Sequence, residues 1–270
     1  SPSLKAPGAL DPWMILLKNL LDRPVPKEFT EMTEDSDQIE DLDKNIHWRL
    51  KGITSKAAYR IFSKYGNPKF QEEDDKEFSQ RLLDGSYNSF LETSLATLFK
   101  RNTEFIGSKT INYAIKFLSQ ATKQKSTMAI LMPHVNNILQ QIVIPVMKMT
   151  HKDVRLFTED PIEFIRKQDD FTMTLYTARH TIVDLLTYIC MYKPKKGKGV
   201  KPEFLHPFLA FVAQNLQEYS QQQGQADWRI KEALLSSIGA LSDQIDLYKE
   251  LREEMEPMLI KHVMPELSSS

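Results

Sequence analysis

Carboxylates are concentrated in one stretch of the sequence, residues 28–43. This stretch contains eight acids and no base, namely Glu28, Glu31, Glu34, Asp35, Asp37, Glu40, Asp41 and Asp43. The chain of 270 residues has a formal net charge of −1, so the remainder carries about +7. Dense negative charge speeds the encounter with basic polypeptides and makes their binding sensitive to salt. We therefore predict that these acids contact basic partners; the alternative is that they only keep a loop solvated.

Catalytic chemistry has little support in the sequence. Motifs of metalloproteases, serine hydrolases, nucleotide-binding loops and paired zinc-binding cysteines are all missing. The single cysteine, Cys190, cannot form an internal disulfide, which favours a reducing compartment, and its apolar surroundings predict a core residue. We predict a protein that is not an enzyme and needs no metal or cofactor. A helical enzyme with carboxylates at Asp169 and Asp170 is the weaker alternative, because Thr172 and Met173 stand where a further acid is needed.

One motif predicts a helix start in three ways. Asp160 is suited to cap the helix, Pro161 to occupy its first position, and Glu163 to reach back to the backbone N–H of Asp160. The other expected features are inward-facing Ile162, Phe164 and Ile165, with Arg166 and Lys167 near the C-terminal end of the helix.

Apolar residues recur at helical spacing through most of the chain, and no alternating strand pattern occurs. The fold class is therefore all-α. Gly85, Pro133 and Pro145 are expected to weaken or kink the helices that contain them. The expected helices cover about residues 12–21, 46–65, 78–98, 104–118, 127–146, 161–167, 177–192, 204–216, 227–241 and 250–264.

Two internal similarities indicate repeats. Residues 48–51 and 228–231 share the pattern W-R-[LI]-K, and residues 142–145 resemble residues 262–265. These similarities predict an α-solenoid of HEAT-type antiparallel helix pairs, with repeats of roughly 40–70 residues, as a single segment over residues 1–270. A generic helical bundle is the alternative. Trp48 and Trp228 are expected to be packing anchors rather than exposed binding residues.

Two loops are expected within this array: an acidic flexible loop over residues 27–45 and a basic inter-helix loop over residues 193–201. The lysines of the second loop resemble a nuclear-localisation patch, although a solvated connection explains them more simply. Polar residues interrupt the longest apolar stretches, so we expect no membrane span. The chain starts without Met, and we expect it to be a fragment of a longer protein.

The run LFTEDPIEFIR at residues 156–166 resembles the importin-β (karyopherin-β) superfamily, and most of all its importin seven and eight branch with the fungal relatives. Other motifs similar to that branch follow in the same order along the chain, at residues 23–26, 65–68, 142–147, 226–229 and 260–265. The export receptor of importin-α is a more distant relative of the same superfamily.

This resemblance implies a central fragment of a HEAT-repeat receptor that carries cargo through nuclear pores and shuttles between cytoplasm and nucleus. It implies basic cargo, such as ribosomal proteins or histones, released by the GTPase Ran in its GTP form. The main Ran-binding repeats of such receptors lie N-terminal to the region that this chain resembles. Nucleoporins are further expected partners, whereas a membrane or direct nucleic-acid contact is not. The alternatives are a HEAT-repeat scaffold subunit of another complex and, less favoured, the importin-α export receptor.

Overall fold

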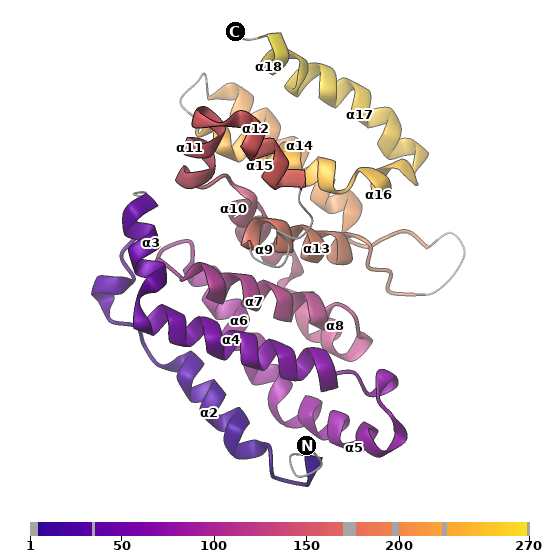
Figure 1. The fold of residues 1–270 in the computed structure, drawn as a ribbon. Coiled ribbons are helices and arrows are strands. Elements are labelled where there is room, and N and C mark those ends of the chain that lie inside the picture. The colour runs from indigo at the N-terminus through magenta and orange to yellow at the C-terminus, as the bar shows by residue number, and fades with distance from the viewer. Residues whose placement is uncertain (1–4, 34–35, 170–176, 196–199, 223–225, 269–270) are drawn as a thin grey trace. The chain divides into compact units, whose positions relative to one another are not determined.

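The computed structural model describes residues 5–33, 36–169, 177–195, 200–222 and 226–268. These residues form helices and connections, with no strand among them, so the all-α prediction is confirmed (Figure 1). The elements are α2 (Asp11–Asp22), η1 (Lys27–Phe29), α3 (Ser36–Lys44), α4 (Ile46–Tyr65), η2 (Pro68–Phe70), α5 (Glu73–Leu82), η3 (Leu83–Tyr87), α6 (Asn88–Lys100), α7 (Ser108–Ala121), α8 (Lys125–Leu131), η4 (Met132–His134), α9 (Val135–Ile138), η5 (Leu139–Val143), α10 (Ile144–Met147), α11 (His151–Glu159), α12 (Pro161–Asp169), α13 (Ala178–Cys190), α14 (Leu205–Gln221), α15 (Trp228–Ala240), α16 (Ser242–Asp246), α17 (Lys249–His262) and α18 (Met264–Ser268).

The chain divides into two compact units, Ser1–Leu185 (unit 1) and Leu186–Ser270 (unit 2). In unit 1, Phe62 of α4 contacts Tyr87, Phe90 of α6 and Phe117 of α7, with ring centroids 5.1, 5.6 and 5.2 Å away. In unit 2, α14 packs on α15, and Leu216 and Leu234 are inaccessible to solvent. Buried aromatic and aliphatic side chains therefore hold each unit together from within.

Hydrogen bonds at the C-terminal ends of α4 and α7 and just beyond them indicate that these two helices run side by side in the same direction. The Gln120 amide donates to the Ser63 hydroxyl, 57 residues away, and the Gln124 amide donates to the Gly66 carbonyl, 58 residues away. A nearly constant separation is what two parallel helices in successive repeats produce. The antiparallel partner of α7 is α6, which directly precedes it and packs against it (Figure 1).

The next long helix, α13, also contacts α7, because the Thr181 hydroxyl donates to the Asn112 side chain, 69 residues away (2.6 Å). Equivalent helices thus recur at separations within the expected repeat length. The prediction of a HEAT-type α-solenoid is confirmed.

The helix breakers act where the sequence places them. Pro133 lies in the 3₁₀ turn η4, and Pro145 is the second residue of α10, which directly follows the π-helical turn η5. Proline lacks the N–H that would bond to the preceding turn, so the helix changes its winding there. Gly85 lies inside a second π-helical turn, η3.

The run Lys125–Glu159 is long and apolar enough to cross a bilayer, which the sequence interpretation had not anticipated. Half of its most apolar window is buried inside the protein. Met128, Leu131 and Val135 are inaccessible to solvent. Packing in the core of unit 1 thus accounts for the apolar character of this run.

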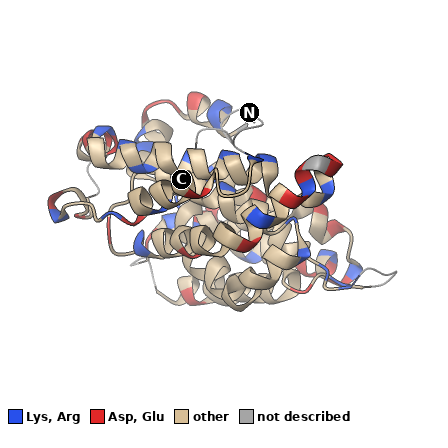
Figure 2. Ribbon diagram, turned by 90° about the horizontal axis from the view of Figure 1, so that it is seen from below, with Lys and Arg blue, Asp and Glu red and all other residues tan. Residues whose placement is uncertain are grey.

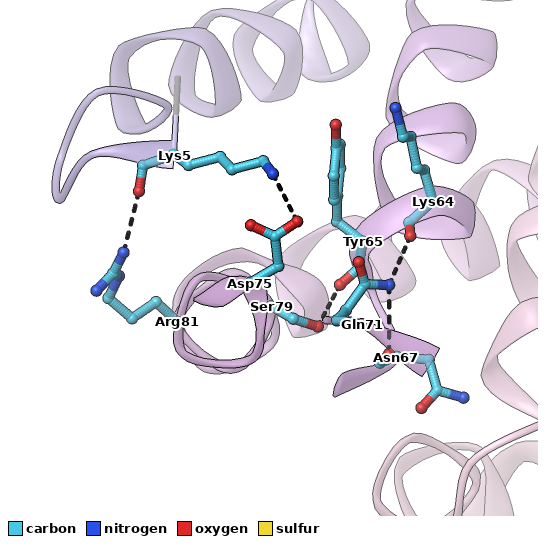
Figure 3. A network of polar contacts seen from close by, with 8 residues as sticks. All are labelled: Lys5, Lys64, Tyr65, Asn67, Gln71, Asp75, Ser79 and Arg81. Atoms are coloured by element: carbon cyan, nitrogen blue, oxygen red, sulfur yellow. Dashed lines mark hydrogen bonds and ion pairs between the residues drawn. The ribbon is translucent and has the colours of Figure 1, made fainter. Parts of the chain in front are cut away.

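The corner between α4 and α5 is held by a network of polar contacts (Figure 3). The Lys5 ammonium pairs with the Asp75 carboxylate at 2.5 Å, and the Arg81 guanidinium donates to the Lys5 carbonyl at 3.2 Å. The Ser79 hydroxyl donates to the Tyr65 carbonyl at the end of α4. These contacts attach the N-terminal segment to α5 and satisfy a carbonyl that the helix end leaves unpaired.

Candidate protein-binding surface

The acidic residues do not form the continuous loop expected over residues 27–45. Residues 27–29 form the 3₁₀ turn η1, and residues 36–44 form helix α3. The helix places the half-buried Ile39 and Leu42 three residues apart on one side. Its C-terminal Lys44 complements the helix dipole and pairs with Glu40 at 3.0 Å. The loop prediction is therefore wrong for residues 36–44, while Glu34 and Asp35 lie outside the described residues.

A groove of about 400 Å³ lies between η1 and α3. Its acidic lining consists of the exposed Glu28, Glu31 and Asp41, and its apolar lining consists of Phe29, Met32 and Leu42. The Thr33 hydroxyl donates to the Gln38 side chain at 2.9 Å and so joins the two sides. A lysine or arginine side chain fits this combination, because its aliphatic stem packs on apolar atoms while its charged end pairs with a carboxylate.

Trp48 fixes the base of the groove. Its indole Nε1–H donates to the Phe29 carbonyl at 2.8 Å, and its ring meets Phe105 edge-on with centroids 5.8 Å apart. The Phe105 N–H donates to the Thr30 carbonyl at 2.8 Å, and Phe29 stacks on His47. Trp48 is only 3% exposed, so the prediction that it is a packing anchor is confirmed.

Three of the eight predicted acids are already engaged within the chain. Asp43 accepts from the Ser108 N–H (2.7 Å) and hydroxyl (2.6 Å) at the start of α7. The hydrogen bond from Lys44 lowers the pKa of the Glu40 carboxyl from its ordinary value of 4.5, and the same bond raises the pKa of Lys44. Asp37 lies 4.0 Å from the Arg155 guanidinium.

Among the described acids, Glu28, Glu31 and Asp41 remain as candidate contacts, together with the apolar residues of the groove. No local sequence signal could have distinguished Asp43 from the other acids of the segment, because its partner Ser108 lies 65 residues further along the chain. The apolar lining formed by Phe29, Met32 and Leu42 was not predicted, because the spacing of the acids does not reveal it.

The cap at Asp160 is confirmed, but the reciprocal contact from Glu163 is not. The Glu163 N–H donates to Asp160 Oδ1 at 2.9 Å, and Pro161 is the first residue of α12. The Asp160 N–H donates instead to the Leu156 carbonyl of α11, so it is not available to Glu163. The Glu163 carboxylate instead pairs with the Arg166 guanidinium at 2.8 Å, three residues further along the same helix.

Two isoleucines of α12 point outward, contrary to prediction. Ile162 is 80% exposed and Ile165 is 57% exposed. The helix is attached to α11 through its other side, where Phe164 meets Phe157 edge-on with centroids 5.4 Å apart. Apolar spacing alone did not distinguish these two sides of a short helix.

Trp228 is not a packing anchor, because it is 46% exposed. Asp227 caps α15 by accepting from the Arg229 N–H at 3.1 Å, and its carboxylate also pairs with the Arg229 guanidinium at 2.8 Å. This arrangement explains why Trp228 begins the helix without being buried. The W-R-[LI]-K pattern thus predicted both helix starts but only one buried tryptophan.

Two further sequence candidates for chemistry were Cys190 and the pair Asp169 and Asp170. Cys190 is fully buried, and burial raises the pKa of its thiol to about 12, so it is a core residue as predicted. Asp169 ends α12, and Asp170 lies outside the described residues. In the part of the chain that the structure describes, no three His, Cys, Asp or Glu side chains gather as metal ligands.

Part of the basic loop predicted over residues 193–201 lies outside the residues that the structure describes. Residues 193–195, 200 and 201 connect α13 to α14 without helix, and residues 196–199 are not described. Lys201 forms an ion pair with Glu250 of α17.

These stacked helix pairs define a protein of the α-solenoid class. Comparison with known proteins narrows that class. Residues 71–266 match the family described as Cse1. The chain is 31% identical to the Importin beta-like SAD2 homolog of Arabidopsis thaliana over 265 residues, which cover 97% of this chain and 25% of that protein.

Human Importin-8 is 28% identical over 259 residues, which cover 96% of this chain and 23% of that protein. The Importin alpha re-exporter of Saccharomyces cerevisiae is 32% identical over 108 residues, only 40% of this chain and 10% of that protein. The chain belongs to the importin-β superfamily, a family of nuclear transport receptors. It spans about a quarter of the length of the relatives that match it almost throughout.

Proposed function

We propose that this chain is a cargo-binding part of a nuclear import receptor, and that its cargo consists of basic proteins such as ribosomal proteins or histones. The observation that carries this proposal is the groove between η1 and α3, in which exposed Glu28, Glu31 and Asp41 surround an apolar base. Membership of the importin-β superfamily supports the receptor role.

The chemistry of the groove favours side chains that are both long and positively charged. Within the described residues, no ion pair joins Glu28, Glu31 or Asp41 to a base of the chain, so these carboxylates can pair with cargo. An exposed ion pair contributes little by itself, roughly 0.2–1 kcal/mol, whereas several pairs combined with apolar burial give specific binding. A cargo segment with successive basic residues suits this site better than one isolated lysine.

The receptor role brings further proposed partners. Ran in its GTP form releases the cargo, acting mainly through repeats outside this chain, and nucleoporins guide passage through the pore. The receptor moves between cytoplasm and nucleus. The role requires neither catalysis nor a cofactor, and it requires no direct contact with nucleic acid or a membrane.

The test is to neutralise the groove. The variant Glu28→Gln, Glu31→Gln, Asp41→Asn removes three negative charges at the site, and the control Glu92→Gln, Glu254→Gln, Glu256→Gln removes three exposed charges elsewhere. Binding of a fluorescent linker-histone tail is measured by anisotropy at low and near-physiological ionic strength, where the Debye length falls from roughly 30 Å to roughly 8 Å. We expect the site variant to bind at least about tenfold more weakly and with less salt dependence.

An equal loss in both variants would mean that only net charge matters, and the groove would not be the cargo site. Unchanged binding in both would favour a HEAT-repeat scaffold whose partners contact other helix surfaces. The importin-α export receptor remains the less favoured alternative, since that relative matches only part of this chain.

A further inference from the structure

A surface of the opposite charge lies on α4 and α7. The sequences of these helices, IHWRLKGITSKAAYRIFSKY and SKTINYAIKFLSQA, contain no Asp or Glu. They comprise 20 and 14 residues, and an even distribution of the 36 acids of this 270-residue chain would place about four or five there. Figure 2 shows Lys and Arg together with Asp and Glu over much of the ribbon. Among the described helices longer than ten residues, α4 and α7 are the two whose sequences contain no acid.

Five of the Lys and Arg residues of α4 and α7 lie on one side of these two helices. Lys56 of α4 and Lys116 of α7 both lie over the Tyr113 ring, with Nζ atoms 5.9 and 5.2 Å from its centroid. Lys109 lies against Gly52, where a Cβ would be only 3.0 Å from the Lys109 Cβ. The basic face consists of Arg49, Lys56, Arg60, Lys109 and Lys116, with Ile53 in the same helical stripe of α4.

Two acids lie at the edges of this surface, Asp43 and Asp184, and the Asp43 carboxylate is already engaged by the Ser108 N–H and hydroxyl. Lys51 points away, because its ammonium donates to the Leu21 carbonyl at the end of α2. Asp184 of α13 interacts electrostatically with Lys116, at one end of the face. Within the described residues, no ion pair is formed by Arg49, Lys56, Arg60 or Lys109, so these four carry the net positive charge.

We propose that the basic face of α4 and α7 binds an acidic, extended polypeptide segment rich in Asp and Glu. Carboxylates are the complement of closely spaced ammonium and guanidinium groups. Ile53, which is 58% exposed, adds an apolar contact for a side chain between the acidic residues. This partner is chemically distinct from the basic cargo of the groove, and its site is formed by different residues.

The aromatic residues favour a polypeptide over a single-stranded nucleic acid. Proteins that bind single strands stack bases on accessible aromatic rings. Here two lysines lie over the Tyr113 ring, and Tyr59 contacts it with centroids 5.8 Å apart. A base would have to displace these groups, whereas a carboxylate can pair with the lysines in place.

The experiment compares two charge reversals at exposed positions. The variant Arg60→Glu, Lys109→Glu changes the basic face, and the control Lys125→Glu, Lys261→Glu makes the same change of net charge elsewhere. The probe is a fluorescent peptide of alternating Glu and Leu, with binding measured by anisotropy and folding checked by circular dichroism. We expect the face variant to lose at least about tenfold in affinity and the control to lose little.

Equal weakening of both variants, or no binding of the acidic peptide to the unmodified chain, would overturn the proposal. Tighter binding of a single-stranded oligonucleotide, lost in the same face variant, would overturn it in favour of nucleic acid. The groove is tested separately with a basic probe, so failure at one site is distinguishable from failure at the other.

Discussion

Among individual residues, Asp43 shows that an acid in a charged segment can serve the fold rather than binding. It accepts two hydrogen bonds from Ser108, so Asp43→Ala removes the cap that α7 receives from a distant part of the chain. We expect the free energy of unfolding to fall by about 1 kcal/mol, the usual cost of losing a cap, with little change in affinity for a basic peptide. Chemical denaturation and anisotropy measure the two quantities.

The neighbouring acid provides the control for Asp43. Asp41 is exposed and lines the groove, so Asp41→Ala should weaken peptide binding and change stability by no more than about 0.5 kcal/mol. The prediction would be contradicted if Asp41→Ala were the destabilising change and Asp43→Ala the one that weakens binding.

The sequence could predict the role of a residue where that role depends on its immediate neighbours. It could not predict the role where it depends on contacts with residues far along the chain. Asp160 and Asp227 cap their helices, because a cap needs only the next two or three residues. Trp48 and Trp228 share a local pattern, yet Trp48 alone is enclosed by partners such as Phe29 and Phe105. The burial of these two tryptophans is set by long-range packing, which no short pattern encodes.

For whole helices, too, the sequence predicted features set by a single residue and missed features set by packing. The breaks at Gly85, Pro133 and Pro145 were predictable, because each residue limits its own backbone. Helix α3 was not predicted, because its acidic composition resembles that of a solvated loop. Its half-buried Ile39 and Leu42 and its Glu40–Lys44 pair, together with packing on α4, stabilise the helix despite that composition.

The approach of α4 to the start of α7 depends on a glycine. A Cβ added at Gly107 would lie 2.9 Å from the Cβ of Trp48, which is buried and held by its hydrogen bond to Phe29. We expect Gly107→Ala to lower the free energy of unfolding by about 1–3 kcal/mol, as overpacking does. Thermal or chemical denaturation measures this change.

Gly85 is the matched control, since a Cβ there would meet no atom within 4 Å. Gly85→Ala should leave stability unchanged or raise it by up to about 1 kcal/mol, because alanine restricts the unfolded chain. If Gly107→Ala were as harmless as Gly85→Ala, Trp48 would be able to move, and it would not be the fixed base of the groove.

For the molecule as a whole, the sequence predicted the repeated architecture but not the surfaces that the repeats create. The array follows from helical spacing and from motifs that recur along the chain, and both are properties of the sequence itself. The groove combines η1 and α3, and the basic face combines helices whose contacting residues are 57 or 58 residues apart. Both candidate binding surfaces therefore exist only after the helices have packed.

The two units make a prediction about how the chain loses structure. Stability in a solenoid arises mainly within repeats and between nearest neighbours, so a cavity should act locally. Leu234 in α15 of unit 2 and Leu118 in α7 of unit 1 are both inaccessible to solvent, and replacing either by alanine should cost about 3–5 kcal/mol. Measured by hydrogen exchange, Leu234→Ala should reduce amide protection in α14 and α15 and leave α7 protected, whereas Leu118→Ala should do the reverse. Loss of protection throughout both units in either variant would instead show that the chain unfolds as one cooperative block, against the behaviour expected of an array of repeats.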